Sequence, residues 1–167
     1  MLIFDASTLI LISRIELLDP FLAGVSLEAV IPQEVERECC SVKSSLDALM
    51  IRKAMDDSRI RVIRVKDKRL VAKLQEDFSL GKGEAEAIAL GISERAQLVA
   101  MDDKNGINAC KLLHLSFTTA AGILIRSLEK GLISSSAALE KLDKLAHYGR
   151  YKSSIIQDVR ARLEGSK

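Results

Sequence analysis

The sequence lacks long apolar runs and is poor in cysteine, and each shortage excludes a class of protein. No stretch of about 18 apolar residues occurs, so no transmembrane helix is expected. The apolar start, residues 1–13, lacks the basic region of a secretory signal and contains Asp5. The three cysteines are odd in number, and adjacent Cys39 and Cys40 are poorly placed to bridge each other. We therefore expect a soluble, cytoplasmic protein without a disulfide framework.

Several catalytic signatures are also missing. Gly81-Lys82-Gly83-Glu84 lacks the spacing of a Walker A loop or of a dinucleotide-binding fingerprint. His114 and His147 do not have the spacing of a zinc-binding pair. No Gly-x-Ser-x-Gly elbow for acyl transfer is present. Histidine, thiol and nucleophilic-serine chemistry are therefore all poorly supported, which leaves the carboxylates.

The net charge neither requires nor excludes a polyanionic partner. Lysine and arginine number 25 against 23 acidic residues, a formal charge of +2. A basic stretch that a phosphate backbone would attract consists of Arg59, Arg61, Arg64, Lys66, Lys68 and Arg69, with Arg150 and Lys152 further along. A solvated charged face explains the same residues.

Short apolar segments alternate with helical patterns along the chain. Strands are expected at residues 2–4, 27–31, 60–65 and 98–101. Helices are expected near residues 8–18, 32–38, 45–55, 70–78, 84–94, 104–113, 119–130, 136–147 and 152–164. This alternation predicts an α/β fold, a three-layer α/β/α sandwich with a mostly parallel central sheet and a helical C-terminal tail.

Acidic side chains follow two of the expected strands. Asp5 comes directly after the first strand, and Asp102 comes directly after the last. Because ligands of parallel sheets bind outside the carboxyl ends of the strands, both side chains are expected at one edge. Hard divalent cations prefer oxygen ligands and stabilise the charges that develop when a phosphodiester bond is cut. The two aspartates therefore indicate a site for Mg²⁺ or Mn²⁺.

Each of these acids also has a structural explanation. Asp5 is suited to cap the following helix, while Ser7 either caps that helix or orients the Asp5 carboxylate. Asp102 and Asp103 together are typical of a turn, with Asp103 at the start of the next helix. Glu84 is suited to a solvated first helical turn. Position alone leaves both explanations open.

Helix periodicity also leaves the choice among several glutamates open. Glu34 and Glu38 share one helix face, with Glu36 on the opposite side. Glu84 and Glu86 point about 200° apart around their helix, so only one of these two is expected to face a site.

Several short segments, in this order, carry a shared pattern. They are Ile3-Phe4-Asp5-Ala6-Ser7, then residues 31–38, 83–90 and 98–103, and later residues 121–124 and 130–133. The pattern resembles the PIN-domain family, in particular the small prokaryotic PilT N-terminus-like proteins related to VapC-type toxin ribonucleases. Thr119-Ala120 departs from the Gly-Thr that this branch often shows, which leaves the acids intact.

The resemblance implies which acids form the site. By position, the four catalytic acids of the family fall on Asp5, Glu38, Glu84 and Asp102. It therefore selects Glu38 over Glu34, and it implies that Asp5, Glu84 and Asp102 bind Mg²⁺ or Mn²⁺. Ser7 matches the hydroxyl residue that supports the first acid, and Asp103 is a frequent neighbour of the fourth.

The resemblance also implies a function. Residues 1–133 are expected to form a PIN-like nuclease domain, and residues 134–167 a helical extension packed on it or extending it. The expected activity is metal-dependent hydrolysis of RNA, with a role as the toxin of a toxin–antitoxin pair, an antitoxin protein as partner and a homodimer as assembly. Two alternatives are a phospho-aspartyl protein, either a receiver domain or a phosphatase, and a non-catalytic binding module of the same fold. Such phosphatases usually have a second aspartate where this chain has Ser7.

Overall fold

The computed structural model describes residues 1–40 and 44–165. The strands are β1 (Leu2–Phe4), β2 (Ala29–Pro32), β3 (Ile60–Ile63), β4 (Leu98–Ala100) and β5 (Phe117–Thr118). The helices are α1 (Ala6–Arg14), α2 (Leu18–Gly24), α3 (Gln33–Cys40), α4 (Leu46–Asp56), α5 (Lys68–Phe78), α6 (Lys82–Ser93), α7 (Lys104–Leu112), α8 (Ala120–Glu129), α9 (Ser135–Tyr148) and α10 (Ser153–Gly165).

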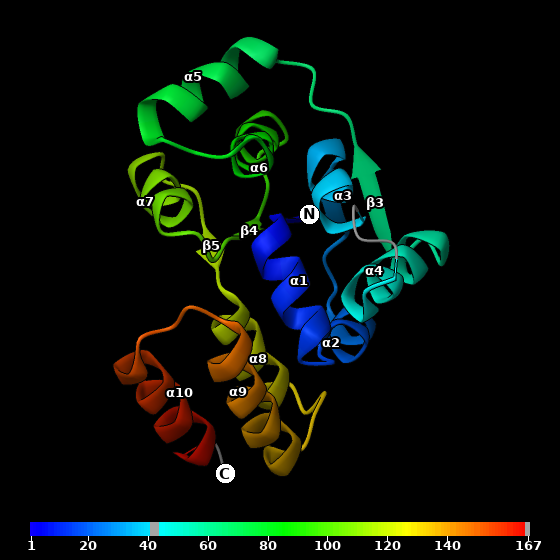
Figure 1. Cartoon of the computed structure of the whole chain (residues 1–167), viewed down its shortest axis with the longest axis vertical. Helices are drawn as coiled ribbons and strands as arrows, with labels where there is room; N and C mark the ends of the chain where they lie inside the picture. The colour runs from blue at the N-terminus through cyan, green and yellow to red at the C-terminus, as the bar shows by residue number, and fades with distance from the viewer. Residues whose placement is uncertain (41–43, 166–167) are drawn as a thin grey trace.

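The strands form one parallel sheet in the order β3-β2-β1-β4-β5. Figure 1 shows the outer strand β3 on one side of the molecule and the strands β4 and β5 on the other. From the central strand β1 the chain moves outward to β2 and β3, and then returns to β4 on the other side of β1. The strand order therefore reverses between β1 and β4. In sheets of this kind the ligand crevice lies at that reversal, outside the carboxyl ends of the strands. The predicted α/β fold with a parallel sheet is confirmed.

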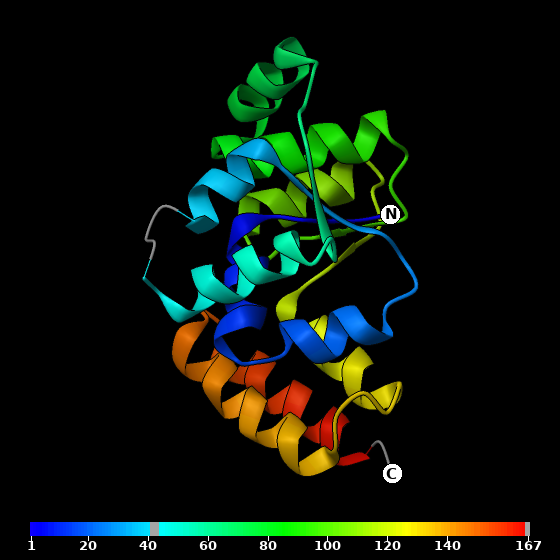
Figure 2. The same ribbon diagram turned by 90° about the vertical axis from the view of Figure 1, so that its right-hand side faces the viewer.

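Helices cover both faces of the sheet because successive strand side chains point to opposite sides. Leu2 and Phe4 belong to one apolar core, whereas Ile3 belongs to the other. The first core takes buried side chains from α1, α2, α3, α4, α8, α9 and α10, and the second takes them from α5, α6 and α7. Figure 2 shows α5, α6 and α7 on one side of β1 and the C-terminal helices on the other. The two helical layers and the sheet between them form the predicted three-layer α/β/α arrangement.

The C-terminal helices share the core of the sheet. Leu142 and Leu145 of α9 and Leu163 of α10 are buried in the same cluster as Phe4. The helices α8, α9 and α10 contact one another, and α9 also contacts α1. The division of the chain after residue 133 stays a prediction, and residues 166–167 of the predicted extension lie outside the described residues.

The predicted first helix is wrong in its extent, and of the caps that the sequence allows the structure has Asp5. The helix α1 begins after Asp5, which caps it, and not at Ser7 or Thr8. It ends at a turn in which Glu16 adopts a left-handed conformation (φ 57°) and the Leu17 N–H donates to the Ile12 carbonyl at 2.8 Å. This is the hydrogen-bonding pattern that usually has glycine at the left-handed position.

Two short elements were not predicted from the sequence. They are the helix α2, which follows the turn at Glu16, and the two-residue edge strand β5. None of the helices in residues 1–40 and 44–165 is long and apolar enough to span a bilayer.

Replacing Leu142 with alanine tests whether α9 belongs to the core. Because Leu142 is fully buried, we expect the free energy of unfolding to fall by about 2–5 kcal/mol. The matched control is Leu112→Ala, since Leu112 is 70% exposed and its truncation should change that free energy by less than about 0.5 kcal/mol. Urea denaturation measures both, and equal losses in the two variants would contradict the shared core.

Candidate functional site

Asp5 lies at the carboxyl end of β1 and is fully buried. Its Oδ1 accepts a hydrogen bond from the backbone N–H of Thr8 at 2.8 Å, which caps α1. Its Oδ2 accepts a hydrogen bond from the Ser7 hydroxyl at 2.5 Å. Ser7 thus orients the Asp5 carboxylate and does not cap the helix. Asp5 has the structural role of a cap and also presents a carboxylate at the strand end.

Asp102 follows β4 at the same edge and is also held on both oxygens. Its Oδ2 accepts a hydrogen bond from the backbone N–H of Ala120, the first residue of α8, at 2.8 Å. Its Oδ1 accepts a hydrogen bond from the hydroxyl of Tyr151, which lies between α9 and α10. A helix N-terminus favours a negative charge, so α8 stabilises the ionised carboxylate.

The two carboxylates, here called the aspartate pair, interact electrostatically across the reversal between β1 and β4. Burial raises the pKa of Asp5 to about 7, and the charge of Asp102 adds to that rise. Burial also raises the pKa of Asp102. The Thr8 hydroxyl lies close enough to both carboxylates to oppose these rises. Yet Thr8 Oγ1 is buried and finds no hydrogen-bond partner of good geometry in the described part of the chain.

Glu38 and Glu84, here called the glutamate pair, lie against the glycine turn that begins α6. The Gly83 backbone hydrogen-bonds Glu38, and the Gly81 backbone hydrogen-bonds Glu84. Partial burial and the neighbouring charge of Glu84 raise the pKa of Glu38. Burial and the charge of Asp103 raise the pKa of Glu84.

The four predicted acids therefore form two pairs. Asp103 interacts electrostatically with Glu84 and follows Asp102 directly in the sequence. Its own Oδ1 caps α7 by accepting a hydrogen bond from the Gly106 N–H at 2.8 Å. In residues 1–40 and 44–165 no three Asp, Glu, His or Cys side chains form a group that would hold a metal ion. The glutamate side chains hydrogen-bond backbone groups near the start of α6.

The remaining glutamates of the two helices belong to an ion-pair network. Glu34 is buried and pairs with Arg37 and with Lys82, whose Nζ lies 2.8 Å from its Oε2. Glu86 is buried and pairs with Lys68 at 3.0 Å, and it also accepts a hydrogen bond from the Glu34 N–H at 3.3 Å. The network joins α3, α5 and α6 and has a structural role.

Tyr151 is the site residue that sequence reasoning missed. The family resemblance does not extend beyond residue 133, and the sequence marks this segment only by the gap between the helices expected at residues 136–147 and 152–164 and by the basic residues Arg150 and Lys152. The one signal in the sequence that favours Tyr151 is its rarity, because the chain has only two tyrosines and no tryptophan. The contact with Asp102 spans 49 residues of sequence, so no local pattern reveals it.

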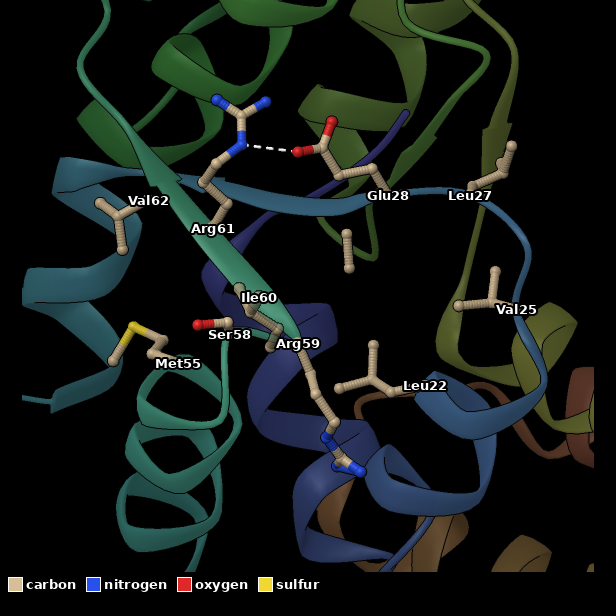
Figure 3. Close-up of a pocket in the computed structure, with 11 residues that line it drawn as sticks. Leu22, Val25, Leu27, Glu28, Met55, Ser58, Arg59, Ile60, Arg61 and Val62 are labelled. Atoms are coloured by element: carbon tan, nitrogen blue, oxygen red, sulfur yellow. Dashed lines mark hydrogen bonds and ion pairs between the residues drawn. The ribbon is translucent and has the colours of Figure 1, made fainter.

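A cavity of about 500 Å³ lies away from the acids, at the amino ends of β2 and β3 (Figure 3). Leu22, Val25 and Met55 are among its lining residues. Two residues of the basic stretch also line it, but both are already paired. Arg61 Nε lies 2.6 Å from Glu28 Oε1, and Arg59 pairs with Asp19. These pairs favour the explanation of this stretch as a charged surface.

The aspartate pair fits a hard divalent cation. Each carboxylate oxygen that already accepts one hydrogen bond retains a second lone pair. The unpartnered Thr8 hydroxyl offers another oxygen beside the same two carboxylates. Because Mg²⁺ usually keeps several waters and is held through one or two carboxylates, a pair of acids is an adequate donor set.

The fold and the site define an α/β protein with an acidic centre at the carboxyl edge of a parallel sheet. The PIN-domain family profile matches residues 1–164. The chain therefore belongs to the PIN-domain family, whose members are generally nucleases and typically use divalent metals. Neither the curated proteins nor the solved structures gave a significant match.

The pKa of Asp5 predicts a pH-dependent stability. The folded chain retains a proton on Asp5 up to about pH 7, whereas the unfolded chain loses it near the ordinary value of 3.8. The free energy of unfolding of the metal-free protein therefore falls as pH rises through this window, with about 4 kcal/mol as the upper value. Asp5→Asn should remove this contribution.

Urea denaturation in the presence of a chelator, at pH 4.5 and pH 8, measures the effect. The matched control is Asp158→Asn, because Asp158 is exposed on α10. Parallel pH profiles for the wild type and Asp5→Asn would contradict the assignment.

Proposed function

We propose that this protein is a divalent-metal-dependent endoribonuclease whose centre is the aspartate pair. The observation that carries the proposal is that two interacting carboxylates, the buried Asp5 and the partly buried Asp102, lie where the sheet reverses its strand order. Membership of the PIN-domain family supports it. The alternative of a phosphatase with an aspartate nucleophile is less well supported, because this chain has Ser7 where such proteins usually have a second aspartate.

The proposal gives each acid a role. Asp5, Asp102 and Glu84 hold Mg²⁺ or Mn²⁺, directly or through bound water, and Glu38 orients the attacking water. When bound, the cation supplies positive charge for the attacking and leaving oxygens of the phosphodiester. Ser7 keeps the Asp5 carboxylate in place. As the family resemblance implies, the expected products carry a 5′-phosphate and a 3′-hydroxyl.

Exposed cations near the aspartate pair support a polyanionic substrate. Arg150 and Lys152 are exposed and flank Tyr151, whose hydroxyl contacts Asp102. Lys104 is exposed and follows Asp103 at the start of α7. Such side chains attract a phosphate backbone without reading its sequence.

The proposal extends to partners and cellular location. We propose an antitoxin protein that holds the nuclease inactive, a homodimer and a cytoplasmic location. Leu46 and Leu49 on α4 support an apolar contact with another chain, since they are 64% and 51% exposed.

Cleavage of single-stranded RNA in the presence of Mn²⁺ tests the proposed activity. We expect the wild type to cleave, and Asp5→Asn and Asp102→Asn to lose at least about 100-fold in rate, because each loses a negative metal ligand. Asp158→Asn is the matched control and should keep wild-type activity. Equal rates in all four proteins, or no cleavage by the wild type, would contradict the proposal.

Gly83→Ala tests the role of Glu38 separately. A Cβ on Gly83 would lie 2.6 and 2.7 Å from the two carboxylate oxygens of Glu38, so that side chain must move. We expect RNA cleavage to fall about 10- to 100-fold, while Mn²⁺ affinity at the aspartate pair and the melting temperature are kept. Gly165→Ala is the control, because a Cβ there meets nothing within 4 Å. Unchanged cleavage by Gly83→Ala would refute the role of Glu38.

A further inference from the structure

We propose that Tyr151 is a positioning residue of the metal site and that the segment between α9 and α10 thereby completes this site. The phenol hydroxyl fixes the orientation of the Asp102 carboxylate that faces the cation. The inference rests on the proposed function, since it concerns the metal ligand Asp102.

The hydroxyl of Tyr151 makes two hydrogen bonds that together link three parts of the chain. It donates to Oδ1 of Asp102, and its oxygen accepts from the Ala121 N–H at 3.3 Å. The Ala120 N–H holds the other oxygen of Asp102 at 2.8 Å. The carboxylate is therefore held at both oxygens and cannot rotate without breaking a hydrogen bond.

Each of the first three backbone N–H groups of α8 has a hydrogen-bond acceptor at or beside Asp102 and Tyr151. The N–H of Ala120 donates to Asp102, that of Ala121 to Tyr151, and that of Gly122 to the Thr119 hydroxyl at 3.1 Å. Removing the Tyr151 hydroxyl leaves the Ala121 N–H without its acceptor and Oδ1 of Asp102 without this donor. A buried donor or acceptor without a hydrogen-bond partner lowers the stability of the folded state more than the loss of a surface contact does.

Local sequence explains how Tyr151 reaches the site. The helix α9 ends at Tyr148, and Gly149 follows as its C-cap. A Cβ on Gly149 would lie 2.7 Å from Cδ2 of Tyr151 and 2.8 Å from the Leu145 carbonyl oxygen. Glycine at this position therefore leaves room for the ring, which packs half-buried against the first core.

The chemistry of metal sites gives this contact a function. Groups that hydrogen-bond a metal ligand fix its orientation, and their loss typically weakens metal binding by about 10- to 100-fold. Tyr151 leaves a second lone pair on Oδ1 of Asp102 available, so its hydrogen bond and a cation are compatible on the same carboxylate.

The test compares Tyr151→Phe with Tyr148→Phe. Both changes remove one hydroxyl and keep the ring, but Tyr148 is 46% exposed on α9 and makes no contact with the aspartate pair that the described residues show. Calorimetric titration with Mn²⁺ should give a 10- to 100-fold weaker affinity for Tyr151→Phe and a wild-type affinity for Tyr148→Phe. The melting temperature without metal reports whether each variant folds.

Tyrosine emission gives a readout that a purely structural role would not affect. Because the chain has two tyrosines and no tryptophan, Tyr151 is the sole emitter in Tyr148→Phe. Titration with Mg²⁺ should change the emission of the wild type and of Tyr148→Phe, and should leave that of Tyr151→Phe unchanged. Gly149→Ala, which keeps the hydroxyl but displaces the ring, should weaken Mn²⁺ binding in the same direction.

The outcomes separate this inference from the proposed function. If the wild type binds Mn²⁺ and cleaves RNA while Tyr151→Phe binds Mn²⁺ with unchanged affinity, the inference fails and the nuclease stands. If the wild type binds no Mn²⁺ at millimolar concentration, both fail. If Tyr151→Phe does not fold, a wild-type Mn²⁺ affinity in Gly149→Ala would overturn the inference.

Discussion

Two carboxylates that interact electrostatically, Asp5 fully buried and Asp102 partly buried, are the constraint on which the rest of this structure depends. A buried negative charge is costly, and a second one beside it raises the cost further. The structure offsets this cost with donors from separate elements: Ser7 and the Thr8 amide for Asp5, and the start of α8 and Tyr151 for Asp102. The positions of α1, α8 and the segment before α10 are thus linked through two side chains.

Much of the fold was predictable from the sequence because its signals are local. Apolar runs followed by acids, and amphipathic stretches between them, predicted four of the five strands and the parallel sheet. The break between α1 and α2 was not predictable, because Glu16 takes a left-handed conformation that sequence patterns assign to glycine. The strand β5 is too short, at two residues, to give a periodic signal.

The candidate site was predictable only in part. That Asp5 and Asp102 meet followed from their places at strand ends, since parallel strands bring their carboxyl ends to one edge. The glutamates depend on how α3 and α6 are rotated against the sheet, which periodicity does not fix. The role of Glu84 as a ligand and that of Glu38 in orienting the water therefore remain predictions, even though the backbone partners of both side chains on the glycine turn are now described. Tyr151 required the tertiary structure, because its contact joins segments that are remote in sequence.

The separation of Tyr151 from Asp102 by 49 residues of sequence has a consequence for protein synthesis. A growing polypeptide contains β1, β4 and both aspartates long before it contains residue 151. Until that residue leaves the ribosome, the Asp102 carboxylate lacks one of the two donors that hold it. A nascent chain that has not yet reached residue 151 therefore carries an incompletely organised acidic centre, and only synthesis of the segment after α9 completes it.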